Sequence, residues 1–365
     1  MSKSSKIVIA GGGSGGHLFP ALSIADALAE QGVERDNIIF FGSKYTLEKD
    51  VVPENGYKIF LFSGRGVNKI KSIENLPKNI FNVLGLIAAF FKSFYLLYKI
   101  KPAVVVGVGG FASFPAMLSA KILKLKILVH EQNSVLGRIN RIAQKLGATV
   151  ITTFSKVDGV QNPIHLGLPL REEVLQQLGS SSHSERSEES YKKAITIFGG
   201  SLGARVINDA VIEMSNTKEA VKDWDITLIT GPKNIDAVDK SIGDNNFGIK
   251  ILPFVTNLFE MILQSDLVVS RAGAGSCVEL EVANVQSVLI PLAIAPGDHQ
   301  TKNASDIVAK GQAIILKEGD LNGGSLFDAI REGLDNSVKP SDSTESIHLT
   351  ADKKIAEYII SNYMS

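Results

Sequence analysis

The residues most able to do chemistry in this sequence follow short apolar runs. GGGSGG at 11–16 comes after one such run and leads directly into His17. A glycine-rich turn at the start of a helix presents backbone N–H groups to an anion, and the helix dipole adds a favourable potential. Tight packing between a strand and a helix explains one or two glycines, but not five in six positions. The segment therefore predicts a ligand that carries phosphate groups.

Two further segments of the first half follow apolar runs in the same way. They are GVGGFAS at 107–113 and HEQN at 130–133. In an open α/β sheet, groups at the carboxyl ends of parallel strands converge on one crevice. We therefore expect a single pocket that is faced by His17, Ser113, Glu131 and Asn133.

The second half repeats this arrangement. GGSLG at 199–203 begins 187 residues after GGSGG at 12–16, and it also follows an apolar run and precedes a helical pattern. RAGAGSCVE at 271–279 follows another apolar run. Its turn could bind a phosphate, and Glu279, about one helical turn inside, could bind a ribose. Glu279 taken alone is equally typical of a solvated helix position.

A dinucleotide-binding oxidoreductase is the first alternative, because Gly11, Gly13 and Gly16 fit its glycine fingerprint. That fingerprint requires an acidic residue at the end of the second strand to bind the ribose. The second strand is expected to end in FFGS at 40–43, which contains no carboxylate. The sequence therefore disfavours NAD binding.

The elements that must position these loops are short apolar strands separated by helices, the pattern of parallel sheets covered on both faces. We predict strands at 6–10, 38–41, 103–108, 127–130, 149–152, 194–198, 226–230, 267–269 and 287–290. Each half opens with a strand, a glycine loop and a helix. The predicted fold class is therefore α/β, with two doubly wound Rossmann-like domains facing across a cleft.

The expected domain boundary lies near residues 165–169, after the last strand of the first half. The first predicted domain is 1–167 together with a closing helix at about 350–365, and the second is 168–349. The run SSSHSERSEES at 180–190 is polar and low in complexity, so we expect an exposed insertion there.

Composition limits the class of protein. At 365 residues the chain exceeds the size of most single cores, and its 44% apolar and 21% charged residues are ordinary for a soluble globular protein. The single cysteine, Cys277, excludes an intrachain disulfide and fits a reducing cytoplasm. Residues 1–167 carry 20 basic and 10 acidic side chains, whereas residues 168–365 carry 18 and 28. The first half is therefore expected to meet an anionic partner, with charge pairing between the halves as the alternative.

Six segments together resemble the MurG family of GT-B glycosyltransferases of peptidoglycan synthesis. They come in the family's order and approximate spacing over nearly the whole chain, namely GGSGGHLFP at 12–20, GGFASFP at 109–115, HEQN at 130–133, GGSLGAR at 199–205, RAGAGSCVE at 271–279 and DHQTKN at 298–303. Three residues depart from the family's pattern, where Leu202 replaces a glutamine, Leu168 an asparagine and Phe114 a glycine. These departures concern polar contacts near the cleft, the junction between the domains and the acceptor loop.

The resemblance implies an inverting transfer of N-acetylglucosamine from UDP-GlcNAc to the C4 hydroxyl of the muramyl sugar in undecaprenyl-pyrophosphoryl-MurNAc-pentapeptide, without a cofactor. It implies donor contacts from Arg171, Ser201, Val255, Arg271, Ser276, Glu279 and Gln300. It implies acceptor contacts from Ser14, Gly15, Gly16, Gly110, Ser113 and Asn133. His17 is then the expected general base, because the positive end of a helix dipole favours the neutral imidazole. Glu131 or Asn133 would orient the acceptor or the base.

The most apolar segment is residues 80–98. It is almost as long as the roughly 20 residues of a spanning helix, but Lys92 near its centre would cost about 2.5–3.5 kcal/mol. On a helical wheel, Lys92 falls in one stripe with Lys78, Asn82 and Lys99. We expect a peripheral contact with anionic lipid on the cytoplasmic face of a bacterial inner membrane, with an ordinary buried helix as the alternative.

Other functions share parts of this pattern. Another GT-B enzyme, such as a UDP-GlcNAc 2-epimerase or a diacylglycerol glucosyltransferase, or an inactive UDP-sugar-binding scaffold, would carry similar donor motifs. An epimerase has no use for the basic, apolar surface of the first half. Nucleic-acid binding is disfavoured, because no recognition motif is present. No metal site is expected, since the one Asp-x-Asp, at 223–225, precedes a strand at the opposite edge of the predicted sheet.

Overall fold

The computed structural model describes residues 5–63, 76–110, 112–180, 192–216, 221–243, 248–336 and 346–364. Residues 181–190 of the predicted insertion lie outside these ranges. The chain forms two compact units. Unit 1 is Met1–Arg171 together with Ile347–Ser365, and unit 2 is Glu172–Ser346.

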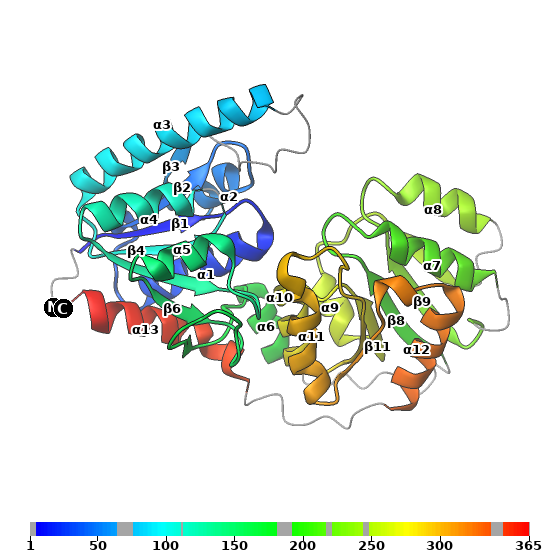
Figure 1. Cartoon of the computed structure of the whole chain (residues 1–365). Coiled ribbons are helices and arrows are strands. Elements are labelled where there is room, and N and C mark those ends of the chain that lie inside the picture. Colours follow the sequence, from blue (N-terminus) through cyan, green and yellow to red (C-terminus); the bar gives the residue numbers. More distant parts are fainter. Residues whose placement is uncertain are drawn as a thin grey trace. The chain divides into compact units, whose positions relative to one another are not determined.

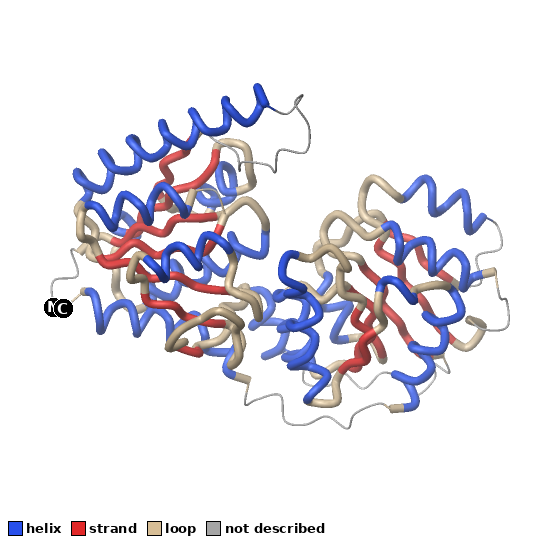
Figure 2. The backbone as a smooth tube through the Cα atoms, in the orientation of Figure 1, coloured by secondary structure: helices blue, strands red, loops and turns tan. Residues whose placement is uncertain are grey.

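Unit 1 contains a seven-stranded parallel sheet in the order β3-β2-β1-β4-β5-β6-β7 (Figures 1 and 2). Its strands are β1 Ile7–Gly11, β2 Ile38–Ser43, β3 Lys58–Phe62, β4 Val104–Gly109, β5 Lys126–Glu131, β6 Thr149–Thr152 and β7 Ile164–His165. Its helices are α1 Gly15–Glu30, η1 Arg35–Asn37, α2 Glu48–Glu54, α3 Leu76–Ile100, α4 Ser113–Ile122, α5 Arg138–Lys145, η7 Ile347–Thr350 and α13 Ala351–Tyr363.

Alternate residues of the central strands face two separate cores. Ile7 and Ile9 of β1 pack with α1 and α13 on one face of the sheet. Val8 and Ala10 pack with α3, α4 and α5 on the other. Because both faces are covered by helices, the central strands are apolar throughout, as parallel sheets require.

Unit 2 contains a six-stranded parallel sheet in the order β10-β9-β8-β11-β12-β13. Its strands are β8 Lys193–Phe198, β9 Trp224–Ile229, β10 Ile249–Leu252, β11 Leu267–Ser270, β12 Gln286–Leu289 and β13 Ala313–Ile315. Its helices are α6 Glu172–Ser180, α7 Arg205–Ser215, α8 Ile235–Ile242, α9 Leu258–Leu263, α10 Ala274–Ala283, η4 Pro296–Asp298, α11 His299–Ala309, η5 Glu318–Asp320 and α12 Gly323–Asp335. In both units every glycine loop of the sequence analysis lies at the carboxyl ends of the strands.

The predicted α/β class with two doubly wound sheets is confirmed, and all nine predicted strands are present within one or two residues. The strands that were not predicted are β3, β7, β10 and β13, which are the edge strands of the two sheets. Edge strands are covered less completely than central ones, so they need no continuous apolar run. That the two domains face across a cleft stays a prediction.

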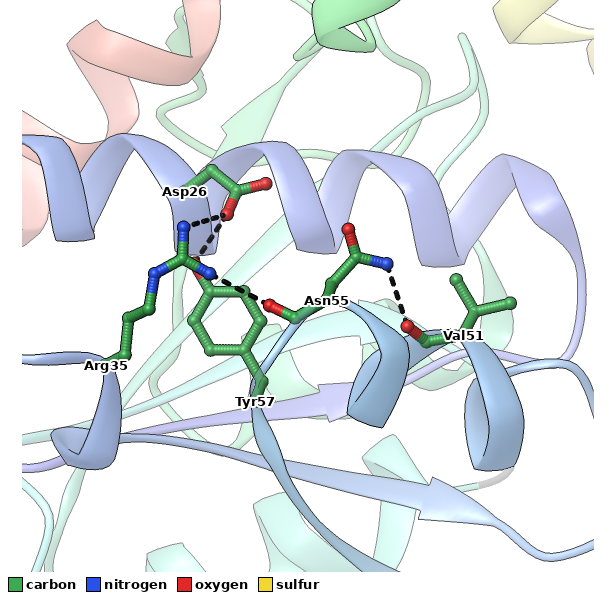
Figure 3. Close-up of polar contacts among 5 residues, drawn as sticks. All are labelled: Asp26, Arg35, Val51, Asn55 and Tyr57. Atoms are coloured by element: carbon green, nitrogen blue, oxygen red, sulfur yellow. Dashed lines mark hydrogen bonds and ion pairs between the residues drawn. The ribbon is translucent and has the colours of Figure 1, made fainter.

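A polar cluster attaches α1 to the β3 edge of unit 1 (Figure 3). The Tyr57 hydroxyl, just before β3, donates to the Asp26 carboxylate on α1 at 2.6 Å. Arg35 donates to the same carboxylate at 3.4 Å and to the Asn55 carbonyl oxygen at 2.8 Å, and its guanidinium lies 4.9 Å from the centre of the Tyr57 ring. Burial and the nearby Asp26 charge raise the pKa of Tyr57. The cluster therefore fixes the helix that begins at the first glycine loop.

Replacing Tyr57 by Phe should lower the free energy of unfolding by about 1.5–3 kcal/mol, because a hydrogen bond to a charged group is lost while the ring packing stays. Chemical denaturation followed by circular dichroism measures the change. Tyr98→Phe is the matched control, since that ring is 59% exposed and should be replaced without effect. Equal unfolding midpoints for the two variants would contradict the assigned role of the cluster.

Candidate active site

Two glycine loops at the carboxyl edge of unit 1 contact each other. Gly11, Gly12 and Gly13 have φ values of 148°, 132° and 101°, which other residues rarely adopt. The Gly12 N–H donates to the Gly109 carbonyl oxygen at 3.2 Å. A side chain at Gly110 would collide with the carbonyl oxygen of Gly12. The approach of the loop after β1 to the loop after β4 therefore requires glycine in both.

His17 lies in the first turn of α1, against these two loops. Its ring packs over Gly109, where an added Cβ would lie 3.0 Å from the His17 Cε1 atom. The His17 Nδ1 atom lies 3.2 Å from Oε1 of Gln132, and the side chain is half-buried. Burial lowers the pKa of His17, whereas Glu131, Gln132 and Glu48 act in the opposite direction. The ring is therefore mostly neutral at pH 7 and able to accept a proton.

Glu131 is the last residue of β5 and Asn133 lies two residues later, but their side chains have different surroundings. Glu131 is only 2% exposed. Its carboxylate accepts hydrogen bonds from the N–H groups of Asn133 at 3.1 Å and Gly137 at 2.8 Å, and from Asn140 Nδ2 at 2.9 Å. Asn133 is partly exposed. The Glu131 carboxylate therefore organises the loop that carries Asn133, and the expectation that Glu131 or Asn133 orients the acceptor or the base stays a prediction.

The predicted acceptor contacts of unit 1 divide into two groups. Ser113 is fully buried, and its hydroxyl lies 2.6 Å from the carbonyl oxygen of Ala10 and 2.7 Å from that of Gly109. The prediction that Ser113 contacts the acceptor is therefore wrong, because this hydroxyl joins β1 to β4 beneath the loops. The other residues are exposed or partly exposed at the start of α1 and in the loop after β4, namely Ser14, Gly15, Gly16 and Gly110. The Ser14 side chain makes no capping hydrogen bond.

Glu48 is a component of this edge that the sequence analysis missed. Its buried carboxylate accepts hydrogen bonds from the Gly13 N–H at 3.1 Å, the Ser43 N–H at 2.9 Å and the Thr46 hydroxyl at 2.6 Å. It therefore joins the first glycine loop to the end of β2. The available signal was an acidic residue five positions beyond Ser43, the expected end of that strand.

Three glycines at the carboxyl edge of unit 2 have open space beside them, whereas Gly199 and Gly203 at the same edge are in close contact with backbone atoms. No atom lies within 4 Å of the position that a Cβ would take at Gly200, Gly273 or Gly275. Gly273 has an ordinary φ of −66° and is the N-cap of α10, so neither its conformation nor crowding requires glycine. The start of α10 is thus open to an anion, whose charge the helix N-terminus favours. Exposed or partly exposed on these loops and on α10 are Ser201, Ser276 and Glu279.

Arg271 does not extend into this open space. Its guanidinium forms an ion pair with Glu318 at 2.5 Å and donates to the carbonyl oxygens of Ile290 at 3.1 Å and Pro291 at 3.4 Å. The Arg271 side chain is 12% exposed. The expected direct contact with the donor is therefore not supported, because this side chain connects the ends of β11 and β12 to η5.

The remaining predicted donor contacts occupy different places. Gln300 lies in the first turn of α11, where its Oε1 atom accepts the Leu292 N–H at 2.9 Å. Val255 is partly exposed in the loop after β10. Arg171 belongs to unit 1, and its guanidinium lies 5.4 Å from the centre of the Phe19 ring on α1. Contacts within unit 2 therefore do not bring Gln300, Val255 and Arg171 together.

Within the described part of the chain, no group of three or more His, Cys, Asp or Glu side chains is arranged to hold a metal ion. Asp223 and Asp225 lie at the amino end of β9. The glycine loops lie at the opposite, carboxyl edge of the same sheet.

Comparison with known families covers both units. Residues 7–152 match the glycosyltransferase family 28 N-terminal domain, and residues 194–359 match the family 28 C-terminal domain. A protein of Myxococcus xanthus is 33% identical over 332 residues, which cover 90% of this chain and 84% of the relative. A protein of Leuconostoc citreum is 33% identical over 333 residues, covering 89% and 88%. Both relatives are named UDP-N-acetylglucosamine--N-acetylmuramyl-(pentapeptide) pyrophosphoryl-undecaprenol N-acetylglucosamine transferase.

Solved structures share the fold. The crystal structure of MurG from Acinetobacter baumannii superposes with a TM-score of 0.73 at 24% identity, covering 98% of this chain and 99% of that one. The calicheamicin glycosyltransferase CalG4 superposes with a TM-score of 0.65 at 12% identity, covering 98% of each chain. At these identities, the likeness concerns the two-sheet architecture alone.

The buried His130 predicts how the stability of unit 1 depends on pH. Burial lowers the pKa of His130 to about 4, below its ordinary value of 6.5. Between these two pH values the unfolded chain binds a proton that the native state does not, so stability falls as pH falls. The contribution is up to about 1.4 kcal/mol per pH unit.

His130→Gln should remove this contribution while keeping a donor for the same carbonyl group. Denaturant titrations between pH 4 and 6.5 measure how the free energy of unfolding depends on pH. The slope of this dependence should be smaller in His130→Gln than in the wild type by the equivalent of about one bound proton. Titrations at pH 8 give the baseline, since His130 is neutral there in both states. Parallel curves for the two proteins across the acid range would show that His130 is not buried in its neutral form.

Proposed function

This chain belongs to glycosyltransferase family 28, and we infer from its 33% identity to the named transferases that it transfers N-acetylglucosamine from UDP-GlcNAc to a lipid-linked N-acetylmuramyl-pentapeptide. It is a hexosyltransferase of peptidoglycan synthesis. The observation that carries the mechanism is His17, a half-buried, mostly neutral imidazole at the start of α1 between two glycine loops.

We assign the nucleotide sugar to the carboxyl edge of unit 2. The open space beside Gly200, Gly273 and Gly275 supports this assignment, because a diphosphate can approach the backbone N–H groups there. Ser201 and Ser276 supply hydroxyl donors, and Glu279 supplies a carboxylate for the ribose hydroxyls. Gln300, whose Oε1 is already engaged, offers its Nε2 group to the sugar. Val255 and the backbone around it would meet the uracil.

We assign the lipid-linked acceptor to the carboxyl edge of unit 1. Ser14, Gly15 and Gly16 present the N-terminus of α1 to the acceptor diphosphate, and Gly110 and Asn133 lie on neighbouring loops of the same edge. A helix N-terminus stabilises a bound anion through its free N–H groups and its dipole. The excess of basic side chains in residues 1–167 favours the same anionic partner.

The reaction then requires one proton transfer and one displacement. The C4 hydroxyl oxygen of the muramyl sugar attacks C1 of N-acetylglucosamine, and the bond from C1 to the UDP oxygen breaks with inversion. His17 takes the hydroxyl proton, and general base catalysis of this kind contributes typically 10²–10⁴-fold. UDP leaves with its electron pair, and the N–H groups at the start of α10 stabilise the developing charge.

We propose that α3 attaches unit 1 to an anionic membrane surface on the cytoplasmic side. Within the described residues, one helical segment is long and apolar enough to cross a membrane: Val83–Ile100 has a mean hydropathy of 1.6, and 17% of it is buried. Ala89, Ser93 and Leu97, four residues apart, form its packed side. Its exposed large side chains recur at three- or four-residue spacing, and they include Leu84, Ile87, Phe91, Tyr95 and Tyr98.

A contact along the surface fits α3 better than a span across the bilayer. Lys92 donates to the Leu61 carbonyl oxygen on β3 at 2.8 Å, and Leu97 belongs to the core beneath the helix. A spanning helix would lose these contacts, and it would bury the Lys92 charge in hydrocarbon. Lys99 and Lys101 at the end of α3 are exposed and attract anionic lipid. The side chains of Lys78 and Asn82, which were predicted to share the stripe of Lys92, lie outside the described residues.

His17→Asn should reduce transfer of labelled N-acetylglucosamine to a short-chain lipid-linked muramyl-pentapeptide analogue by about 10²–10⁴-fold. Calorimetry should show unchanged binding of UDP-GlcNAc, because His17 is assigned to the acceptor side of the reaction. His165→Asn, a substitution of a histidine that bonds to the Thr153 carbonyl oxygen, is the matched control and should stay active. Transfer at the wild-type rate by His17→Asn would exclude His17 as the base.

The variant Phe91→Ser with Tyr95→Ser should bind vesicles of phosphatidylglycerol and phosphatidylethanolamine at least about tenfold more weakly than the wild type, since two aromatic groups no longer enter the interface. Flotation at low salt measures the bound fraction. Leu202→Ser is the control, because Leu202 is 77% exposed but lies in unit 2. Failure of the wild type to float, or equal flotation of the double variant, would rule out the proposed surface.

A further inference from the structure

A chain of hydrogen bonds runs from His17 into the core of unit 1. The His17 Nδ1 atom lies 3.2 Å from Gln132 Oε1. Gln132 Nε2 lies 3.1 Å from the Val108 carbonyl oxygen and 3.2 Å from His130 Nδ1. His130 Nε2 lies 2.9 Å from the Gly167 carbonyl oxygen. Gln132 and His130 are 3% and 1% exposed, so water does not replace these bonds.

The two carbonyl oxygens determine where every proton of this chain lies. A carbonyl oxygen only accepts, so His130 Nε2 carries a hydrogen and donates it to Gly167. A neutral imidazole has a single N–H, which leaves a lone pair on His130 Nδ1. The two hydrogens of Gln132 Nε2 are then donated to His130 Nδ1 and to Val108. A flipped amide would instead point its oxygen at the Val108 oxygen, which is repulsive.

The same assignment of hydrogen atoms extends to the ring of His17. Gln132 Oε1 is left as an acceptor, so the Nδ1 atom of His17 must be the donor. The neutral ring then holds its only hydrogen on Nδ1, and Nε2 carries the lone pair. Nε2 makes no hydrogen bond to any residue that the structure describes. We propose that Gln132 is a positioning residue that holds neutral His17 in the Nδ1–H tautomer and so presents Nε2 as the proton acceptor for the sugar hydroxyl.

An amide suits this position better than a carboxylate. The charged groups that act on His17 are Glu131 and Glu48, and neither accepts a hydrogen bond from it. A carboxylate in direct contact with Nδ1 would stabilise the imidazolium strongly. Gln132 orients the ring without that charge, so the proton taken from the acceptor is readily released after transfer.

The inference rests on the proposed role of His17 as the base, but its first test needs no substrate. Long-range ¹H–¹⁵N correlation spectra of protein labelled with ¹⁵N-histidine, at pH 8, report which ring nitrogen carries the hydrogen. His17→Asn identifies the His17 signal. We expect Nδ1–H in the wild type, although neutral histidine in water favours Nε2–H. A wild-type ring in the Nε2–H form would overturn the proposal without any variant of Gln132.

Gln132→Met removes both polar ends of the side chain at similar volume. We expect His17 to shift towards the Nε2–H tautomer and kcat to fall by about 10²-fold or more, as for other catalytic histidines held in the wrong tautomer. The KM for UDP-GlcNAc should be unchanged. Gln144→Met on α5 is the matched control. The Gln144 side chain also bridges two backbone groups, the Gly159 carbonyl oxygen and the Gln161 N–H. An unchanged tautomer or an unchanged kcat in Gln132→Met would refute the assignment.

Gln132→Glu provides a second test, because a purely structural role of Gln132 would not change the pH dependence of kcat/KM. The carboxylate should keep the Nδ1–H tautomer but raise the pKa of His17, so the acid limb of the kcat/KM profile should move to higher pH. A profile that coincides with the wild type would count against Gln132 as the partner of His17. Full activity of His17→Asn would overturn the proposed base and leave the tautomer spectra as the separate test of Gln132.

Discussion

The candidate site of unit 1 depends on how closely two backbone loops approach. The loops after β1 and β4 meet through the bond from Gly12 to Gly109, and no side chain fits between Gly12 and Gly110. Beneath the loops, the buried Ser113 hydroxyl bonds to the Ala10 carbonyl oxygen. Beside them, the Glu48 carboxylate accepts a hydrogen bond from the Gly13 N–H. The His17 ring packs over Gly109, where a Cβ would lie 3.0 Å from the His17 Cε1 atom. The orientation of one imidazole is thus set by backbone geometry on several neighbouring strands.

Glycines at the carboxyl edges of the two sheets are present for two different physical reasons. In unit 1 the glycines are needed for positive φ values and for contact between loops. At Gly273 and Gly275 in unit 2 the missing side chains leave empty space at the start of a ten-residue helix. The first pattern builds a rigid support for a side chain, and the second leaves room for a ligand to approach the backbone. The repeated loop of unit 2 retains the first pattern at Gly203, which has a φ of 74° and no room for a Cβ beside the Thr230 carbonyl oxygen.

The sequence predicted the central strands and the carboxyl-edge loops because both leave a local signal: a continuous apolar run, then glycines. The edge strands β3 and β13 are only partly buried, and they were missed although both carry apolar residues, in KIFLF and AII. Side-chain direction was less predictable. Ser113 and Arg271 stand in the expected segments, yet one turns beneath the loops and the other turns to Glu318. Those choices follow from which carbonyl and carboxylate groups lie nearby, and such groups come from strands far apart in the chain.

The return of α13 to unit 1 has a consequence for how the protein is made. Ile355 and Ile359 belong to the same core as Leu22 and Leu28 of α1, whereas unit 2 is formed by the intervening Glu172–Ser346. Synthesis proceeds at about 5–20 residues per second, so the apolar side of α1 waits on the order of tens of seconds for its cover. Unit 2 can complete its own sheet during that interval. The half of the chain that is translated first is therefore the last to complete its core. The apolar side of α1 stays exposed to chaperones until α13 has been synthesised and packs against it.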